Sequence, residues 1–279
     1  MLLLSAPALA TAQGAETRRA DSLRLASSDS LLATNFLTEP GASKRDSAFG
    51  LIRASTKGYP TSEADSLDWL AARGSAERAK GFRVVVSMFD RRLWVIRGAD
   101  TLMSAPVAVA TRASLEFGDS SWVFDTPRGT RTVRSKRANP LWTPPIWHYA
   151  EVAKSKELKL AFLSRDNPEW LSDGSRIAVR GREIGLVTRD LGTFQPLPAD
   201  EEIVFDSTLY VPPLGTRNRR IDGELGKYRL DLGDGYLLHG TPHIQTIGDA
   251  ATHGCVRLTD EDIQWLYRHV PVGTRVYIY

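Results

Sequence analysis

From residue 81 onward, the chain is a succession of short apolar segments, each ended within a few residues by glycine, proline or aspartate. Residues 83–88 and 93–97 flank a polar turn at 90–92, which predicts a β-hairpin. Further strands are expected at residues 102–110, 131–134, 176–180, 201–211, 226–232, 235–240 and 274–279. Many short strands with closely spaced turns and few helices are typical of barrels and sandwiches. The sequence therefore predicts a mainly β fold, arranged as a barrel or a sandwich.

One helix, directly after residue 258, is well specified by its local pattern. Thr259 is a suitable N-cap, and the three acidic residues that follow it favour the positive end of the helix dipole. Apolar residues then recur at helical spacing and form one stripe, made of Ile263, Leu266, Tyr267 and Val270. Pro271 and Gly273 end the helix, which we expect to pack on a sheet.

The N-terminal part of the chain lacks this succession of short apolar segments. Residues 62–74 predict a capped helix that ends near Gly74, whereas residues 13–60 have weak periodicity and a marginal helix near 29–36. We interpret residues 13–80 as a low-complexity tether with a short helix. Residues 81–279 are expected to fold and to work without it.

Residues 1–12 form a short apolar stretch that ends in Ala10-Thr11-Ala12. This small-x-small pattern before polar sequence predicts signal peptidase cleavage near Ala10 or Ala12, although the usual basic segment is missing. We therefore interpret residues 1–12 as the remnant of a signal peptide and expect export to the periplasm or cell envelope. A membrane span takes ~20 apolar residues, so no transmembrane segment is predicted.

Composition excludes several classes of protein. The chain is 42% hydrophobic and 25% charged, which is typical of a globular protein and argues against wholesale disorder. Its 36 Lys and Arg residues against 33 Asp and Glu give a net charge of +3 without a basic run, so no nucleic-acid partner is predicted. Cys255 is the one cysteine, which excludes an internal disulfide.

The residues that carry chemistry gather in one window. His239 and His243 stand in Leu-His-Gly-Thr-Pro-His, and His253 and Cys255 stand in Thr-His-Gly-Cys-Val-Arg-Leu at 252–258. A thiol nucleophile needs a base within hydrogen-bonding reach, a group that orients the base, and N–H donors for the oxyanion. The same four side chains are also possible zinc ligands, although Pro242 disfavours a helical His-x-x-x-His pair. A metal assay would separate these readings.

The window resembles the signature of the L,D-transpeptidase catalytic domain. The resemblance consists of His-Gly-Thr at 239–241 and Thr-His-Gly-Cys followed two residues later by Arg257. It extends to the hairpin at 84–96, to Thr-Pro-Arg-Gly at 126–129 and to Leu-Gly-Lys-Tyr at 225–228, and so covers residues 81–279. Residues 135–206 exceed what the family's core requires and are interpreted as a substrate-groove insertion. Residues 13–80 match no accessory domain.

The resemblance implies a role for each position of the motif. It makes Cys255 the nucleophile, His239 the general base and the Gly240 carbonyl the group that orients the imidazole. His253 and Gly254 would shape the turn, with backbone N–H groups there and at Cys255 forming the oxyanion hole. Arg257 would hold a carboxylate of the substrate or brace the loop, and Thr252 would fix the turn through its hydroxyl. Together with Thr241, these two residues are the expected substrate-binding residues. Positive character on the imidazole is expected to lower the pKa of the thiol.

The resemblance further implies an L,D-transpeptidase-like fold and an exported enzyme of peptidoglycan synthesis. Cys255 would attack a tetrapeptide stem, release the terminal D-alanine and pass the acyl group to an amine of a neighbouring stem. No metal and no organic cofactor are implied. Two alternatives stay open: a hydrolytic relative, such as a carboxypeptidase, an endopeptidase or an amidase that releases wall attachments, and an inactive wall-binding module. Trp142, Trp147 and Tyr149 are interpreted as core or groove lining.

Overall fold

The computed structural model describes residues 62–279. The expected signal peptide remnant at residues 1–12 and the expected helix near residues 29–36 lie outside the described residues. Within residues 62–279 the fold is mainly β and contains three α-helices, α3 (Glu63–Arg78), α4 (Ile146–Ser155) and α5 (Asp260–His269). The predicted fold class is confirmed. None of the described helices is both long enough and apolar enough to cross a membrane.

A five-stranded sheet forms the first layer, in the order β3-β2-β1-β20-β7. Its strands are β1 (Phe82–Ser87), β2 (Arg92–Arg97), β3 (Asp100–Pro106), β7 (Gly129–Thr132) and β20 (Arg275–Ile278). Strands β1 and β2 form the predicted hairpin, with Val84 opposite Val95. Strand β20 runs parallel to β1 and antiparallel to β7, so it lies inside the sheet.

A four-stranded sheet, in the order β19-β17-β16-β8, lies across the core from the first. It consists of β8 (Ser135–Ala138), β16 (Tyr228–Gly233), β17 (Tyr236–His239) and β19 (Val256–Arg257). Side chains of both sheets are fully buried together, for example Val84, Leu230 and Leu238. Helix α5 covers this core with Ile263 and Leu266, and Thr259 caps it as predicted, its Oγ1 accepting the Asp262 N–H at 3.1 Å.

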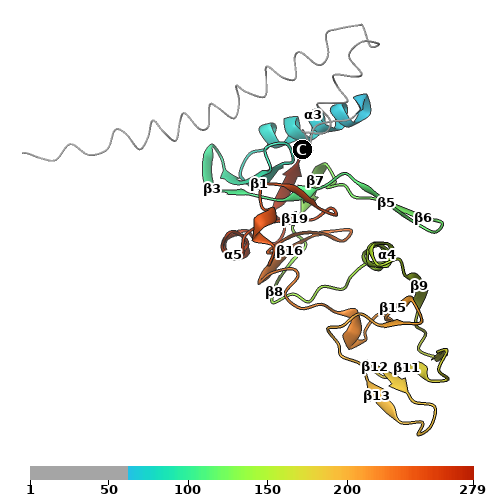
Figure 1. Cartoon of the computed structure of the whole chain (residues 1–279). Helices are drawn as coiled ribbons and strands as arrows, with labels where there is room; N and C mark the ends of the chain where they lie inside the picture. The colour runs from blue at the N-terminus through green and yellow to red at the C-terminus, as the bar shows by residue number, and fades with distance from the viewer. Residues whose placement is uncertain (1–61) are drawn as a thin grey trace, which may run out of the picture. The chain divides into compact units, whose positions relative to one another are not determined.

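Helix α3 continues beyond its predicted end. Gly74 lies inside the helix, because Ala72 and Ala76 on either side of it pack against Trp94 of β2 and Tyr277 of β20. This tertiary packing outweighs the cost of about 1 kcal/mol for a glycine in a helix interior. Figure 1 shows α3 lying against the sheet that contains β1 and β20.

Two predicted strands are broken in the structure. The segment at 102–110 divides into β3 and β4 (Val109–Ala110), and β4 leaves the first sheet to pair in parallel with β18 (Ala250–Thr252). The segment at 201–211 divides into β14 (Val204–Phe205) and β15 (Thr208–Val211), because Asp206 and Ser207 both adopt positive φ and make a tight turn.

The residues between β8 and β16 form an elaborate insertion. It contains α4 and seven strands, which are β9 (Lys159–Phe162), β10 (Glu169–Trp170), β11 (Arg176–Arg180), β12 (Glu183–Val187), β13 (Phe194–Pro196), β14 and β15. Helix α4 packs on β9 and β15 and also on the hairpin of β5 (Ser114–Phe117) and β6 (Ser120–Val123), through β5. The insertion has its own core, built around residues such as Ile177, Ile184 and Tyr210.

Candidate active site

His239 is the last residue of β17, and its side chain is buried with 4% exposure. Its Nδ1 lies 2.5 Å from the carbonyl oxygen of Gly240. A carbonyl only accepts hydrogen bonds, so the neutral ring carries its proton on Nδ1 and donates it to Gly240. The second nitrogen, Nε2, is then left as an acceptor, which is the state that a general base needs.

Gly240 is held in place by the first turn of α5. A Cβ atom at Gly240 would collide with Oδ1 of Asp260, and a Cβ at Gly226 would collide with the same oxygen and with the Gly240 backbone. Oδ1 of Asp260 also accepts the N–H of Lys227 at 3.0 Å. Only residues without a side chain fit between these two segments, so the carbonyl that orients His239 has a fixed position.

The turn that presents Cys255 is closed by a threonine. Oγ1 of Thr252 donates to the carbonyl of Cys255 at 2.6 Å and accepts the N–H of Gly254 at 3.2 Å. Gly254 has a φ of +142°, and a Cβ there would lie 3.2 Å from the carbonyl oxygen of Asp125. The thiol of Cys255 is half-buried, and its Sγ lies 3.8 Å from the carbonyl oxygen of Gly235.

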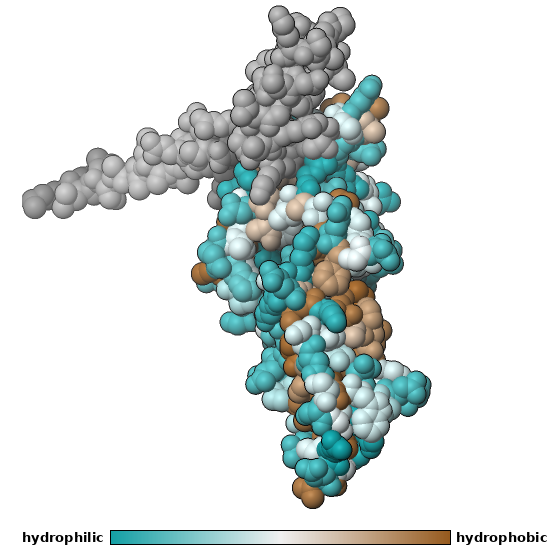
Figure 2. Space-filling view, turned by 45° about the vertical axis from the view of Figure 1, so that its right-hand side comes forward, coloured by the Kyte–Doolittle hydropathy of each residue, from teal (hydrophilic) through white to brown (hydrophobic). Residues whose placement is uncertain are grey.

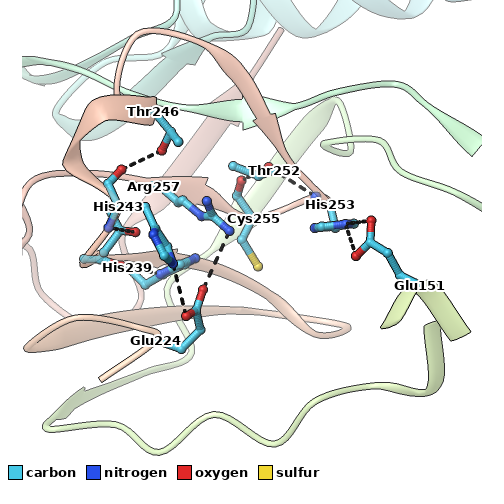
Figure 3. Close-up of polar contacts among 12 residues, drawn as sticks. Glu151, Glu224, His239, His243, Thr246, Thr252, His253, Cys255 and Arg257 are labelled. Atoms are coloured by element: carbon cyan, nitrogen blue, oxygen red, sulfur yellow. Dashed lines mark hydrogen bonds and ion pairs between the residues drawn. The ribbon is translucent and has the colours of Figure 1, made fainter. Parts of the chain in front are cut away.

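Strand pairing brings the turn and the histidine together. Strands β17 and β19 are parallel, with His239 directly opposite Arg257. Cys255 is two residues before Arg257, and Figure 3 shows His239, Cys255 and Arg257 around one space. These residues, with His243, Thr252, His253 and Gly254, line a cavity of about 1080 Å³.

The pair of titratable groups is neutral at pH 7. Burial lowers the pKa of His239 to about 4, against the opposing effect of its hydrogen bond to Gly240, and the charges of Arg257 and Arg229 lower it further. Burial raises the pKa of Cys255 to about 11, although a backbone hydrogen bond and the same two arginines act to lower it. The expected lowering of the thiol pKa by the imidazole is therefore not found, because a neutral buried imidazole supplies no positive charge.

His253 joins the turn to helix α4. Its ring stacks on Trp147 with centroids 4.1 Å apart and meets Phe124 edge-on at 4.4 Å. Its Nε2 lies 3.1 Å from a carboxylate oxygen of Glu151, one helical turn after Trp147. Figure 3 shows Glu151 reaching His253 from α4, on the side of the turn away from His239.

The predicted substrate-binding residues are not equivalent in the structure. Nη2 of Arg257 lies 3.9 Å from Glu224, whose other oxygen lies 3.4 Å from Nε2 of His243. Arg257 and Thr252 both line the cavity. Thr241 is buried and accepts the N–H of His243 at 3.1 Å, so its hydroxyl is used inside its own loop.

The rest of the cavity has an aromatic wall. Trp142 and Trp147, both interpreted as core or groove lining, belong to this wall together with Trp122 and Phe124. Tyr149 instead packs in the core of the insertion, beneath the guanidinium of Arg219.

Figure 2 shows that apolar residues also gather on one outer face of the described part of the chain.

No set of three or more His, Cys, Asp or Glu side chains within residues 62–279 is arranged to hold a metal ion. The four side chains of the zinc alternative, from His239 to Cys255, therefore do not converge on one point. Within the described residues, their contacts are instead with carbonyls, carboxylates and aromatic rings.

Sequence reasoning missed four residues that shape this site. The sequence indicates Asp260 only as part of a helix end, and no sequence pattern marks Glu151, Glu224 or Arg229. Arg229 could have been found by pairing the two predicted strands at 226–232 and 235–240 across their glycine-rich turn. Glu151 and Glu224 belong to segments whose position no local pattern reveals.

The structure places a cysteine, a buried histidine and an arginine on one cavity at the edge of a two-layered β domain, a set of side chains compatible with acyl-transfer chemistry. The sequence identifies the family. The family model of the L,D-transpeptidase catalytic domain matches residues 81–278, and the chain belongs to this family.

Curated relatives agree with this assignment. The protein named "Probable L,D-transpeptidase YbiS" of Escherichia coli strain K12 is 29% identical over 195 residues, which are 69% of this chain and 43% of the relative. The protein named "Putative L,D-transpeptidase YkuD" of Bacillus licheniformis is 31% identical over 118 residues, which are 40% of this chain and 68% of the relative. The chain therefore spans less than half the length of YbiS.

A solved structure of the catalytic domain from the Enterococcus faecium L,D-transpeptidase matches 72% of this chain and 99% of its own, with a TM-score of 0.37 and 10% identity. The family assignment rests on the sequence matches.

Proposed function

We propose that this protein is an exported peptidoglycan L,D-transpeptidase with Cys255 as nucleophile and His239 as general base. The observation that carries the proposal is the Nδ1 contact of 2.5 Å between His239 and the Gly240 carbonyl, because it leaves Nε2 as an acceptor on the cavity that contains Cys255. Membership of the L,D-transpeptidase family supplies the substrate, a peptidoglycan stem peptide.

The first half of the reaction forms a thioester. As Sγ of Cys255 bonds to the carbonyl carbon of the third residue of a tetrapeptide stem, the thiol proton passes to Nε2 of His239. The oxyanion is stabilised by backbone N–H groups of the turn, with Cys255 N–H as a donor because Gly254 N–H already binds Thr252. The C–N bond then breaks, and His239 returns the proton to the amine of the departing D-alanine.

The second half consumes the thioester. An amine of a neighbouring stem attacks the acyl carbon, and His239 takes the proton that the amine loses. The C–S bond breaks, the proton returns to sulfur, and the new amide is a cross-link between two stems. Neither half requires a metal or an organic cofactor, since thiol, base and N–H donors suffice.

Several residues support this chemistry without changing bonds. Arg257 is a guanidinium on the cavity wall and suits a carboxylate of the donor. Thr252, His253 and Gly254 hold the turn of Cys255 in shape through the contacts described above. Residues 81–279 form the catalytic domain in this proposal.

The experiment follows the acyl-enzyme by intact mass. With a disaccharide-tetrapeptide or a carbapenem, which the family resemblance implies as an inhibitor, we expect one adduct per chain, mapped to Cys255 and absent from Cys255→Ala. His239→Ala should slow acylation by about two or more orders of magnitude, which is the usual scale for a lost general base. His269→Ala, an exposed histidine of α5, is the matched control and should acylate normally. No adduct on the unaltered chain, or equal rates in both histidine variants, would refute the mechanism.

The products of the same incubation separate the alternatives. A dimer of stems supports the transpeptidase, whereas a free tripeptide acid shows that water resolves the thioester, as in a hydrolytic relative. A chain that binds stems but never acylates is a wall-binding module. Export is tested separately, because N-terminal sequencing of protein from the native envelope should give a chain that begins after Ala10 or Ala12.

A further inference from the structure

Four side chains form a line across the second sheet. Arg137 of β8 is directly opposite Arg229 of β16, Arg229 is opposite His239 of β17, and His239 is opposite Arg257 of β19. Directly paired residues of adjacent strands project from the same face of a sheet. All four residues line the cavity of Cys255, so three guanidinium groups stand in one row with the buried histidine.

The row is short of anionic partners within residues 62–279. Nε of Arg229 and Nε of Arg257 are both buried without a hydrogen-bond partner there. Arg229 makes no ion pair in that part of the chain, and Arg257 has only the 3.9 Å approach to Glu224. Both arginines are partly exposed to the cavity, but a buried N–H without a partner is costly and is hydrogen-bonded in most proteins.

The carboxylates in the same lining are engaged elsewhere. Asp231 accepts the N–H of Gly233 at 2.8 Å, and Asp234 pairs with Arg131 at 2.5 Å. Glu224 is divided between an arginine and a histidine. The row therefore presents more positive than negative charge to whatever enters the cavity: Arg229 and Arg257 act to lower the pKa of both His239 and Cys255, whereas Asp231 acts to raise the pKa of Cys255.

The spacing of the row suits two carboxylates rather than one. Strands β16 and β19 flank β17, so the backbones of Arg229 and Arg257 are two strand spacings apart, roughly 10 Å. In the proposed reaction the donor carries a terminal carboxylate just beyond the bond that Cys255 breaks. Arg257 is next to the turn of Cys255 and suits that group, which leaves Arg229 and Arg137, on the other side of His239, without a ligand.

We propose that Arg229, assisted by Arg137, binds a second carboxylate of the acyl donor and makes the enzyme selective for it. The ligand is a stem peptide whose third residue has a side chain that ends in a free carboxylate. A donor with the same side chain as a primary amide lacks the charge that the row requires. This inference rests on the proposed function and adds the substrate selectivity of that site.

The test compares two synthetic tetrapeptide donors that differ only in this group, carboxylate or primary amide, by the rate of D-alanine release. For the unaltered enzyme we expect kcat/KM to be at least about tenfold higher for the carboxylate, which is the scale of a charge-assisted hydrogen bond. Arg229→Gln should lose about tenfold or more with the carboxylate donor and less than about twofold with the amide donor. Arg137→Gln, at an exposed position, should lose a smaller factor with the same selectivity.

Two controls separate binding from structure. Arg275→Gln removes an exposed strand arginine outside the cavity and should change neither donor's rate. Arg229→Lys retains the charge and should keep part of the preference. Equal rates of the unaltered enzyme with both donors would overturn the inference, and so would an equal loss with both donors in Arg229→Gln.

The outcome is distinguishable from failure of the proposed function. If the unaltered enzyme releases D-alanine from both donors at the same rate, the proposed function is supported and the second carboxylate site is refuted. If it releases D-alanine from neither donor and forms no adduct on Cys255, the proposed function itself falls.

Discussion

At the scale of single residues, His239 and Cys255 are both uncharged in the candidate site at pH 7. His239 is buried behind the Gly240 carbonyl, and the sulfur of Cys255 lies against the carbonyl of Gly235. Both environments disfavour charge, so in the proposed mechanism the proton moves during the attack on the substrate and not in the resting enzyme. Such a thiol resists oxidation and alkylation between turnovers, because the thiolate is the reactive form.

The raised pKa of Cys255 determines how its free thiol responds to pH. Since burial raises the pKa of Cys255 to about 11, thiolate is absent at pH 7 and forms only as the pH rises through that value. We expect the ultraviolet absorbance of thiolate, and the rate of alkylation by iodoacetamide, to rise steeply above pH 9. Cys255→Ser, which has no thiol, gives the background for both measurements. A thiolate signal at pH 7 would contradict the neutral pair.

The main residues of the candidate site can be predicted from the sequence, but the residues that surround them in the structure cannot. The motif residues His239, Gly240 and Cys255 are near one another in the chain, so a local pattern marks them. Arg229 depends on the register of a bulged hairpin, and Glu151 depends on where a helix of the insertion packs. Such contacts are set by long-range packing, which no short pattern encodes.

At the scale of elements, helix α4 supports the turn of Cys255 from outside the sequence motif that contains it. Trp147 and Glu151 are four residues apart on α4, so both face His253. The stacked ring and the carboxylate fix the orientation of His253, which precedes Gly254 and Cys255. The insertion therefore contributes to the position of Cys255 as well as to the cavity wall.

Weakening this contact should affect turnover more than binding. Glu151→Gln weakens a partly exposed contact between a carboxylate and an imidazole, worth about 0.2–1 kcal/mol, so we expect kcat to fall by up to about fivefold with little change in KM. Trp147→Ala should have a larger effect, because the stacked surface is lost. Glu157→Gln, just after the same helix, is the control for charge. Identical kinetics of Glu151→Gln and Glu157→Gln would show that α4 does not position the turn.

At the scale of the whole described region, α3 is part of the folded unit. Its residues share a buried cluster with Val85 of β1, Trp94 of β2 and Tyr277 of β20, and Trp69 meets Tyr279 edge-on at 6.4 Å. The ion pair of Asp65 with Arg128 ties its first turn to the residue before β7. The sequence indicated a helix here but not its attachment, because the partners of α3 are far away in the chain.

A shortened chain tests whether residues 81–279 are sufficient. Removing α3 uncovers Trp94, Tyr277 and Tyr279, so residues 81–279 should be less stable than residues 62–279 by roughly 3 kcal/mol or more. We expect a melting temperature lower by about 10 °C, with acyl transfer retained at low temperature. Calorimetry of both chains measures the difference. Equal melting temperatures would show that α3 contributes nothing to the stability of the catalytic domain.

Strand β20 is the last strand in the sequence, yet it lies between β1 and β7. During synthesis, β1 and β7 leave the ribosome long before β20, the strand that joins them. Until β20 is made, the backbone N–H and C=O groups that will pair with it have no partner strand. Pairing over such a separation is slow. The first sheet therefore cannot close until β20 has been synthesised, and its completion is a late event in the folding of the domain.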